Sequence, residues 1–143
     1  MFTNARQVTI EWGDCDPAGI VYYPRYFAMF DTSTARLFEA ALGMSKREML
    51  KTYGIIGFPM VETSAKFGAP SRFGDVVHIK SRITRIGRAS FNVAHILHHA
   101  DGVAAIEASE TRVWAIADPN DAERIKGDTI PQSVITALSQ TTP

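Results

Sequence analysis

The first candidate for chemistry in this chain is an acid in an unusual setting. Asp16 lies on a loop broken by proline and glycine, and its neighbours include a cysteine, an isoleucine, a valine and two tyrosines, which solvated loops rarely combine. A carboxylate held among such residues is a candidate for a raised pKa and for chemistry. The alternative is a turn in which Asp14 and Asp16 accept hydrogen bonds from backbone N–H groups. The residues alone leave both interpretations open.

The start of the next helix offers a partner for such an acid. Pro24 suits the first helical position, where its missing N–H costs nothing. Free N–H groups and the positive end of the helix dipole can stabilise an oxygen that gains negative charge. The side chains of Tyr22 and Tyr23 can equally pack into the core.

A second acid, Asp31, falls on the apolar stripe of this helix, one turn after Phe27. A buried carboxylate is costly unless it has a partner. Either it pairs with a neighbouring arginine or turns to solvent, or it accepts a hydrogen bond at the bottom of a substrate pocket.

Other groups are weaker candidates. His95 and His98 would point to opposite sides of a strand, and Asp101-Gly102 is typical of a hairpin turn, so we expect no metal site. Cys15 lies between two acids that disfavour its thiolate, and we expect it to be a small packed residue.

The elements that must position these residues follow from periodicity. Residues 6–12 alternate as a strand with Val8, Ile10 and Trp12 inward. A long helix runs from Pro24 to a stop at Gly43, and Ser45 opens a shorter one. Further strands are expected over residues 60–69, 75–86, 89–99 and 103–117, and a last helix over 131–138. Helices and strands are segregated, which indicates an α+β fold. A sheet wrapped around the long helix is a simple solution for these elements, although periodicity alone does not separate it from other α+β sandwiches.

The run Gly13-Asp14-Cys15-Asp16-Pro17-Ala18-Gly19-Ile20-Val21-Tyr22-Tyr23-Pro24 resembles the signature of the 4-hydroxybenzoyl-CoA thioesterase family. That family has the hotdog fold, a five-stranded antiparallel sheet wrapped around one long helix. The resemblance implies a single hotdog domain over residues 1–143. It also implies that Asp16 attacks the thioester carbonyl or activates water, while the N–H of Tyr23 holds the carbonyl oxygen.

The resemblance further implies a substrate site. Asp31 matches the family's aspartate that meets a ring hydroxyl, and we expect Tyr22, Phe27 and Phe58 to contact the acyl group. Phe58 stands where the resembled enzyme has threonine, and the run Gly87–Phe91 keeps one of its three basic residues. The residues expected to bind the coenzyme A phosphates are Arg88, Arg124 and Lys126.

The expected function is hydrolysis of an aromatic acyl-CoA, with coenzyme A as part of the substrate and no separate cofactor. The alternatives are an aliphatic acyl-CoA thioesterase, favoured if Phe27, Phe30 and Phe58 wall the pocket with Asp31 turned out, and a non-catalytic acyl-CoA-binding protein, which an intact Asp16 argues against. Fifteen basic and fifteen acidic residues cancel, so neither nucleic acid nor membrane is an expected partner. The single cysteine fits a cytoplasmic location. We expect a homo-oligomer, a tetramer by resemblance.

Overall fold

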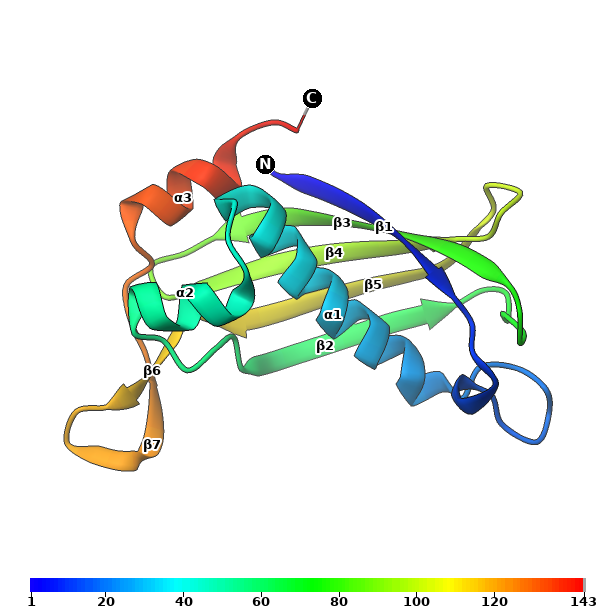
Figure 1. The fold of residues 1–143 in the computed structure, drawn as a ribbon, viewed down its shortest axis with the longest axis horizontal. Helices are drawn as coiled ribbons and strands as arrows, with labels where there is room; N and C mark the ends of the chain where they lie inside the picture. The colour runs from blue at the N-terminus through cyan, green and yellow to red at the C-terminus, as the bar shows by residue number, and fades with distance from the viewer. Residues whose placement is uncertain (143) are drawn as a thin grey trace.

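One long helix, α1 (Tyr23–Leu42), lies across a five-stranded antiparallel sheet in the computed structural model, which describes residues 1–142 (Figure 1). The strand order is β1-β3-β4-β5-β2. The strands are β1 (Thr3–Thr9), β2 (Met60–Phe67), β3 (Val76–Ile86), β4 (Ser90–His98) and β5 (Ala104–Val113). The α+β class and the sheet around a helix were therefore predicted correctly.

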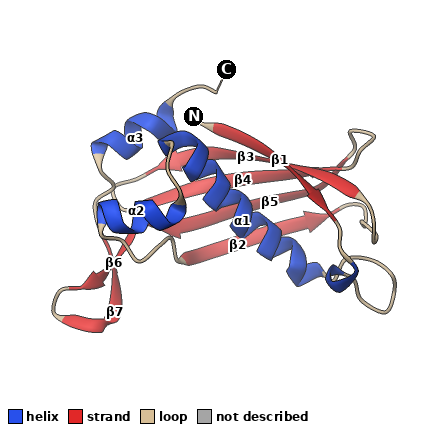
Figure 2. Ribbon diagram, viewed as in Figure 1, coloured by secondary structure: helices blue, strands red, loops and turns tan. Residues whose placement is uncertain are grey.

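Local signals explain the helices. The buried face of α1 carries Tyr26, Met29, Phe30, Ser33, Thr34, Leu37 and Phe38. Gly43 ends α1 in the left-handed conformation, at a φ of 66° that glycine adopts without strain. Ser45 and Glu48 form the predicted capping box of α2 (Lys46–Tyr53). Helix α1 begins one residue before Pro24, and α3 (Gln132–Ser139) lies with α2 against its C-terminal half (Figure 2).

The inner face of the sheet follows the expected alternation. In β4, Phe91, Val93, His95 and Leu97 are all buried. His95 faces Ser81 of β3 and Ala108 of β5 in the register of the sheet. Two apolar clusters fill the space under α1, one around Phe38, Phe91 and Trp114 and the other around Phe30, Ile79 and Leu97. Each fully buried side chain of this size stabilises the fold by roughly 1.5–3 kcal/mol.

Two details of the predicted strands were wrong. Trp12 does not point inward: β1 ends at Thr9, a short 3-10 helix η1 (Trp12–Asp14) turns the chain, and Trp12 is 76% exposed against Phe73. The strand predicted over residues 103–117 is broken at Trp114. The chain there leaves the main sheet, and β6 (Ala115–Asp118) pairs with β7 (Asp121–Gly127) in a separate hairpin that the sequence analysis missed.

The two edge strands of the sheet differ in how they are covered. Strand β1 has α1 beside it, whereas β2 is exposed at every residue except Ala65. Among residues 1–142, no helix has the length and apolar character needed to cross a bilayer.

Candidate active site

The loop before α1 folds back on itself and presents Asp16 at its tip. Asp14 lies opposite Tyr22, whose N–H donates to the Asp14 carbonyl at 2.8 Å, and Cys15 forms an isolated bridge with Val21. The N–H of Asp16 donates to the carbonyl of Ile20 at 2.9 Å. These backbone contacts fix the loop and use neither oxygen of the Asp16 carboxylate.

Both aspartates accept backbone hydrogen bonds, as in the turn interpretation. Asp14 Oδ2 accepts from the N–H of Glu11 at 2.9 Å, and Asp16 Oδ1 accepts from the N–H of Ala18 at 2.8 Å. Oδ2 of Asp16 has no hydrogen-bond partner among residues 1–142, and the half-buried side chain lines a pocket with Trp12 and Phe73. A turn contact therefore orients this carboxylate and leaves one oxygen open for chemistry.

The N–H of Tyr23 opens α1 and makes no hydrogen bond within residues 1–142. It lies close in sequence to the pairing of Tyr22 with Asp14, which brings the start of the helix beside the Asp16 loop. A free N–H at the positive end of a twenty-residue helix can stabilise an oxyanion. The geometry thus provides an acid and a donor at one end of α1.

Aromatic side chains form the surroundings of this helix start. The exposed rings of Tyr22 and Tyr23 lie 5.7 Å apart, and Phe67 of the exposed strand β2 touches Tyr23, Tyr26 and Phe27. The buried Tyr26 hydroxyl accepts from the N–H of Ser71 at 3.1 Å, which ties α1 to the loop before β3.

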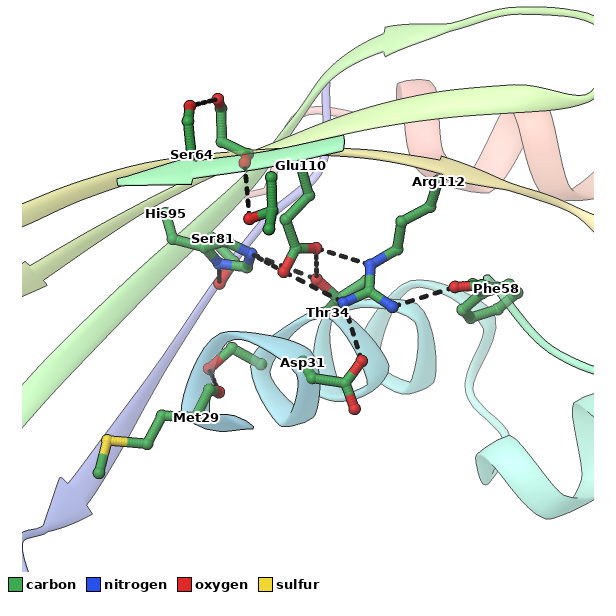
Figure 3. A network of polar contacts seen from close by, with 12 residues as sticks. Met29, Asp31, Thr34, Phe58, Ser64, Ser81, His95, Glu110 and Arg112 are labelled. Atoms are coloured by element: carbon green, nitrogen blue, oxygen red, sulfur yellow. Dashed lines mark hydrogen bonds and ion pairs between the residues drawn. The ribbon is translucent and has the colours of Figure 1, made fainter. Parts of the chain in front are cut away.

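Asp31 lies in a different part of the molecule. Its side chain is 59% exposed, and Oδ1 lies 2.8 Å from Nη2 of Arg112, a residue of β5 that is almost wholly buried (Figure 3). Both line a shallow pocket with Phe58, Met60 and Ile125. Asp31 therefore pairs with an arginine, as one interpretation of the sequence predicts, but the arginine comes from the sheet.

Behind Arg112 lies a buried polar network (Figure 3). Glu110 is 2% exposed, and its carboxylate accepts hydrogen bonds from Arg112 Nε at 2.7 Å and from the hydroxyl of Thr34 at 2.7 Å. His95 Nε2 lies 3.3 Å from Glu110 Oε1, and its Nδ1 lies 2.7 Å from the Ser81 hydroxyl. Burial by itself raises the pKa of Glu110, but hydrogen bonds and charge from His95 and Arg112 lower this pKa to about 2.

The same contacts act on the arginine. Burial by itself lowers the pKa of Arg112, but the carboxylates of Glu110 and Asp31 raise it above its ordinary value. Every buried side-chain nitrogen and oxygen among the described residues has a hydrogen-bond partner. Arg112 is therefore a fixed cation.

Sequence reasoning missed Glu110, Arg112 and His95 as a unit. Their signal is present, because alternation over residues 104–113 places Glu110 and Arg112 on the same face as Ala108. That face turns toward α1, so a charge pair there has to be buried and satisfied. Alternation over this strand therefore marks its limits, and the two charges on its inner face are the signal for the network.

The predicted acyl-pocket phenylalanines do not meet. Phe58 packs in the core with Phe38, Phe91 and Trp114, while Phe30 stacks on His95 at 5.0 Å and Phe27 lies against Phe67. The arrangement that would favour an aliphatic substrate, with all three around one pocket, is absent from the described residues.

The predicted coenzyme A residues belong to the β3–β4 turn and to β7, which lie at the end of the sheet away from the loop before α1 (Figure 1). Arg88 follows β3, and its guanidinium donates to the Thr129 hydroxyl at 2.9 Å. Arg124 and Lys126 lie on β7, where Ile125 between them lines the Asp31 pocket. Because successive side chains of a strand face opposite sides, Arg124 and Lys126 point away from that pocket.

The structure thus divides the predicted residues into two groups. Asp16, Tyr22 and Tyr23 lie at or just before the start of α1. Asp31 lies roughly 12 Å further along the helix at 1.5 Å per residue, and Phe58, from the segment before β2, lines the same pocket as Asp31. Within residues 1–142, no cluster of three or more His, Cys, Asp or Glu side chains is arranged to hold a metal ion.

Comparisons with known proteins agree with this fold. Residues 10–138 match the model of the thioesterase-like superfamily. The chain is 33% identical over 143 residues to 4-hydroxybenzoyl-CoA thioesterase from Pseudomonas sp. strain CBS-3, covering 94% of this chain and 99% of that protein. The structure of that enzyme superposes with a TM-score of 0.86 at 31% identity, over 96% of this chain and 99% of the other.

Two other relatives extend the comparison. A gentisyl-coenzyme A thioesterase superposes with a TM-score of 0.81 at 30% identity, over 95% of this chain and all of the other. A 1,4-dihydroxy-2-naphthoyl-CoA hydrolase from Synechococcus elongatus is 30% identical over 93 residues, which are 65% of this chain and 68% of that protein. On the family match and this degree of identity, the chain belongs to the thioesterase-like superfamily and has its hotdog fold.

Proposed function

We propose that this protein hydrolyses the thioester of an aromatic acyl-CoA, of the 4-hydroxybenzoyl-CoA type, to the carboxylic acid and coenzyme A. The observation that carries the proposal is that two open groups lie at the start of α1: the Asp16 carboxylate, whose Oδ2 has no partner among residues 1–142, and the unbonded N–H of Tyr23. The relatives support the substrate class, because their names specify hydroxylated aromatic acyl groups on coenzyme A.

The proposed reaction consumes one water. Asp16 Oδ2 either attacks the thioester carbonyl carbon or removes a proton from a water that attacks it. The carbonyl oxygen gains charge and accepts a hydrogen bond from the N–H of Tyr23. The carbon–sulfur bond then breaks, and the coenzyme A thiolate leaves and takes up a proton. If Asp16 attacked, the mixed anhydride that it forms with the acyl group is hydrolysed by one water; if water attacked, the acid is already formed.

The acyl group is proposed to meet residues of a second copy of the chain. Asp31 lies about 12 Å along α1 from the helix start beside which Asp16 lies, which is more than one small ring spans. The exposed strand β2 offers an edge on which a second copy can pair. In a dimer, Asp31 of one subunit can accept a hydrogen bond from a ring held at Asp16 of the other, with Tyr22, Phe27 and Phe58 as neighbours. A tetramer built from two such dimers is the assembly that the family resemblance favours.

Coenzyme A is proposed to bind as part of the substrate, with no separate cofactor. Arg88, Arg124 and Lys126 are the proposed phosphate ligands. The β3–β4 turn and β7, which carry them, lie at the other end of the sheet from the loop before α1, so we propose that they bind the coenzyme of a site on the neighbouring subunit. A single hotdog domain and a cytoplasmic location complete the proposal.

A thioesterase panel tests the function. Release of free thiol is followed for 4-hydroxybenzoyl-, benzoyl-, phenylacetyl-, butyryl- and octanoyl-CoA. Highest kcat/KM for the hydroxylated aromatic ester supports the proposal. Higher kcat/KM for the aliphatic esters would make it an aliphatic thioesterase, and tight binding without turnover would make it a binding protein.

Light scattering at low micromolar concentration tests the assembly. A dimer or tetramer is expected, and a monomer with full activity would contradict a site shared between subunits.

A further inference from the structure

We infer that Arg112 is a positioning residue, which fixes the carboxylate of Asp31 as a hydrogen-bond acceptor and so selects acyl groups that carry a hydroxyl donor. The inference rests on the proposed function only in that the acyl group reaches the Asp31 pocket. It adds a residue outside the run of residues 13–24 that carries the family resemblance, because Arg112 lies on β5.

Each of the three guanidinium nitrogens of Arg112 has an acceptor in the protein. Nε and Nη2 donate to the two oxygens of Glu110 at 2.7 and 3.1 Å, and Nη1 donates to the carbonyl of Phe58 at 3.0 Å. The remaining direction of Nη2 points to Asp31 Oδ1 at 2.8 Å. A planar fork bonded in this way cannot turn without breaking several charged hydrogen bonds in a buried site.

Glu110 is fixed in turn by residues of three other elements. The hydroxyl of Thr34 on α1 donates to it, and His95 on β4 lies against its other oxygen while bonding Ser81 on β3. The network therefore registers α1 against the sheet at the level of Asp31. The carboxylate of an exposed helical residue can adopt several orientations by itself, whereas that of Asp31 is paired with a buried arginine held by the network.

The geometry of Asp31 suits one kind of ligand group. Oδ1 is taken by Arg112, and Oδ2 has no hydrogen-bond partner among residues 1–142 at the rim of the pocket formed with Phe58 and Met60. An ionised, oriented oxygen accepts a hydrogen bond from a hydroxyl and repels a carboxylate. A substrate that covers this oxygen without offering a donor leaves it desolvated and unpaired, which weakens binding.

The competing explanation is that Arg112 serves only the fold, by tying β5 to the segment of Phe58. The two explanations predict different results. A structural loss lowers the active fraction and reduces kcat/KM for all esters in proportion. A loss of positioning changes the ratio between a hydroxylated ester and its unsubstituted counterpart.

The experiment measures this ratio for 4-hydroxybenzoyl-CoA and benzoyl-CoA in the intact oligomer. Wild type should prefer the hydroxylated ester by about tenfold to a few hundredfold. Arg112→Lys keeps the charge but loses the fork, and the ratio should fall at least threefold, mainly through KM of the hydroxylated ester, while kcat for benzoyl-CoA changes little. The paired variant Glu110→Gln, Arg112→Met avoids an isolated buried charge and should bring the ratio close to one.

Two controls make the result specific. Arg36→Met removes an exposed arginine of α1 that pairs with Glu39, and its ratio should stay at the wild-type value. In an Asp31→Ala background, Arg112→Lys should cause no further change in ratio, because the arginine acts through that acid. Proportional losses for both esters in every Arg112 variant would overturn the inference.

Binding of the unreactive thioethers 4-hydroxyphenacyl-CoA and phenacyl-CoA, measured by calorimetry, separates this inference from the proposed function. A wild type that hydrolyses no ester but binds the hydroxylated thioether more tightly, in an Arg112-dependent way, would end the proposed activity and keep the role of Arg112. Equal affinities of wild type for the two thioethers would overturn the role of Arg112, whether or not esters are hydrolysed.

Discussion

The start of α1 and the network at its middle use polar groups in opposite ways. At the start, Asp16 keeps an oxygen without a partner and Tyr23 keeps an unbonded N–H, both at a half-open surface. At the middle, Glu110, Arg112 and His95 are buried and each is hydrogen-bonded to protein groups. Both regions lie along the same helix, α1, so the difference between them depends on the residues around each one.

This difference separates polar groups that can react with a substrate from polar groups that can only hold other residues in place. An open acceptor and an open donor can bind a changing charge in a substrate, because nothing in the protein has to be displaced first. A saturated buried network resists any change of charge, and its contribution is orientation and stability. Variants in the two regions should therefore fail differently: in rate at the start of α1, and in stability or selectivity at the network.

The largest effect is expected from breaking the buried network. Arg112→Ala leaves the Glu110 carboxylate buried without its main cation, which should lower the free energy of unfolding by about 3–5 kcal/mol. Guanidinium denaturation measures the loss. The exposed Arg36, paired with Glu39 on α1, is the matched control, and Arg36→Ala should cost at most about 1 kcal/mol. Equal losses for the two arginines would contradict a rigid network.

A pH titration of stability should show the same network. Because the pKa of Glu110 is lowered from 4.5 to about 2 by folding, its stabilisation is complete above about pH 4.5 and is lost as the pH falls toward 2. The loss should be about 3 kcal/mol. Glu110→Gln removes this titration, so the difference in unfolding free energy between wild type and variant should shrink over that range. Parallel curves for the two proteins would show that Glu110 does not carry the effect.

At the start of α1, the expected effect is on rate. Asp16→Asn keeps the shape of the loop and should reduce kcat at least about 100-fold, with a much smaller change in KM. Asp14→Asn is the matched control, because it also removes a loop carboxylate but keeps an oxygen for the N–H of Glu11. Steady-state kinetics with the best ester of the panel measures both. A kcat near wild type in Asp16→Asn would remove the proposed mechanism.

The smallest effect concerns the hydrogen bond between Ser71 and Tyr26, which ties α1 to the loop before β3. Tyr26→Phe deletes the hydroxyl that accepts from the buried N–H of Ser71, which should cost about 1–3 kcal/mol of unfolding free energy. Tyr22→Phe removes an exposed hydroxyl nearby and should change stability by less than about 0.5 kcal/mol. Thermal unfolding of the two variants side by side is the test, and a stable Tyr26→Phe would mean that the loop has another support.

The sequence by itself determined the elements, because their signals are local. Gly43 and the Ser45–Glu48 capping box limit the helices, and alternation marks the strands, since both depend on backbone geometry within a few residues. The run from Gly13 to Pro24 also identified the family, which the comparisons show. Local signals failed at Trp12 and at Trp114, where the chain turns away from a strand although the alternation continues.

Only the tertiary structure decided which side chains meet. Asp31, Arg112, Glu110 and His95 lie on α1, β5 and β4, and no spacing along the chain predicts that they form one network. The same holds for the distance along α1 between its start and Asp31. It holds too for Phe58, which packs in the core and lines the Asp31 pocket and does not join Phe27 and Phe30. Packing between elements fixes such contacts, because a buried charge must find its partner in whatever strand the fold places beside it.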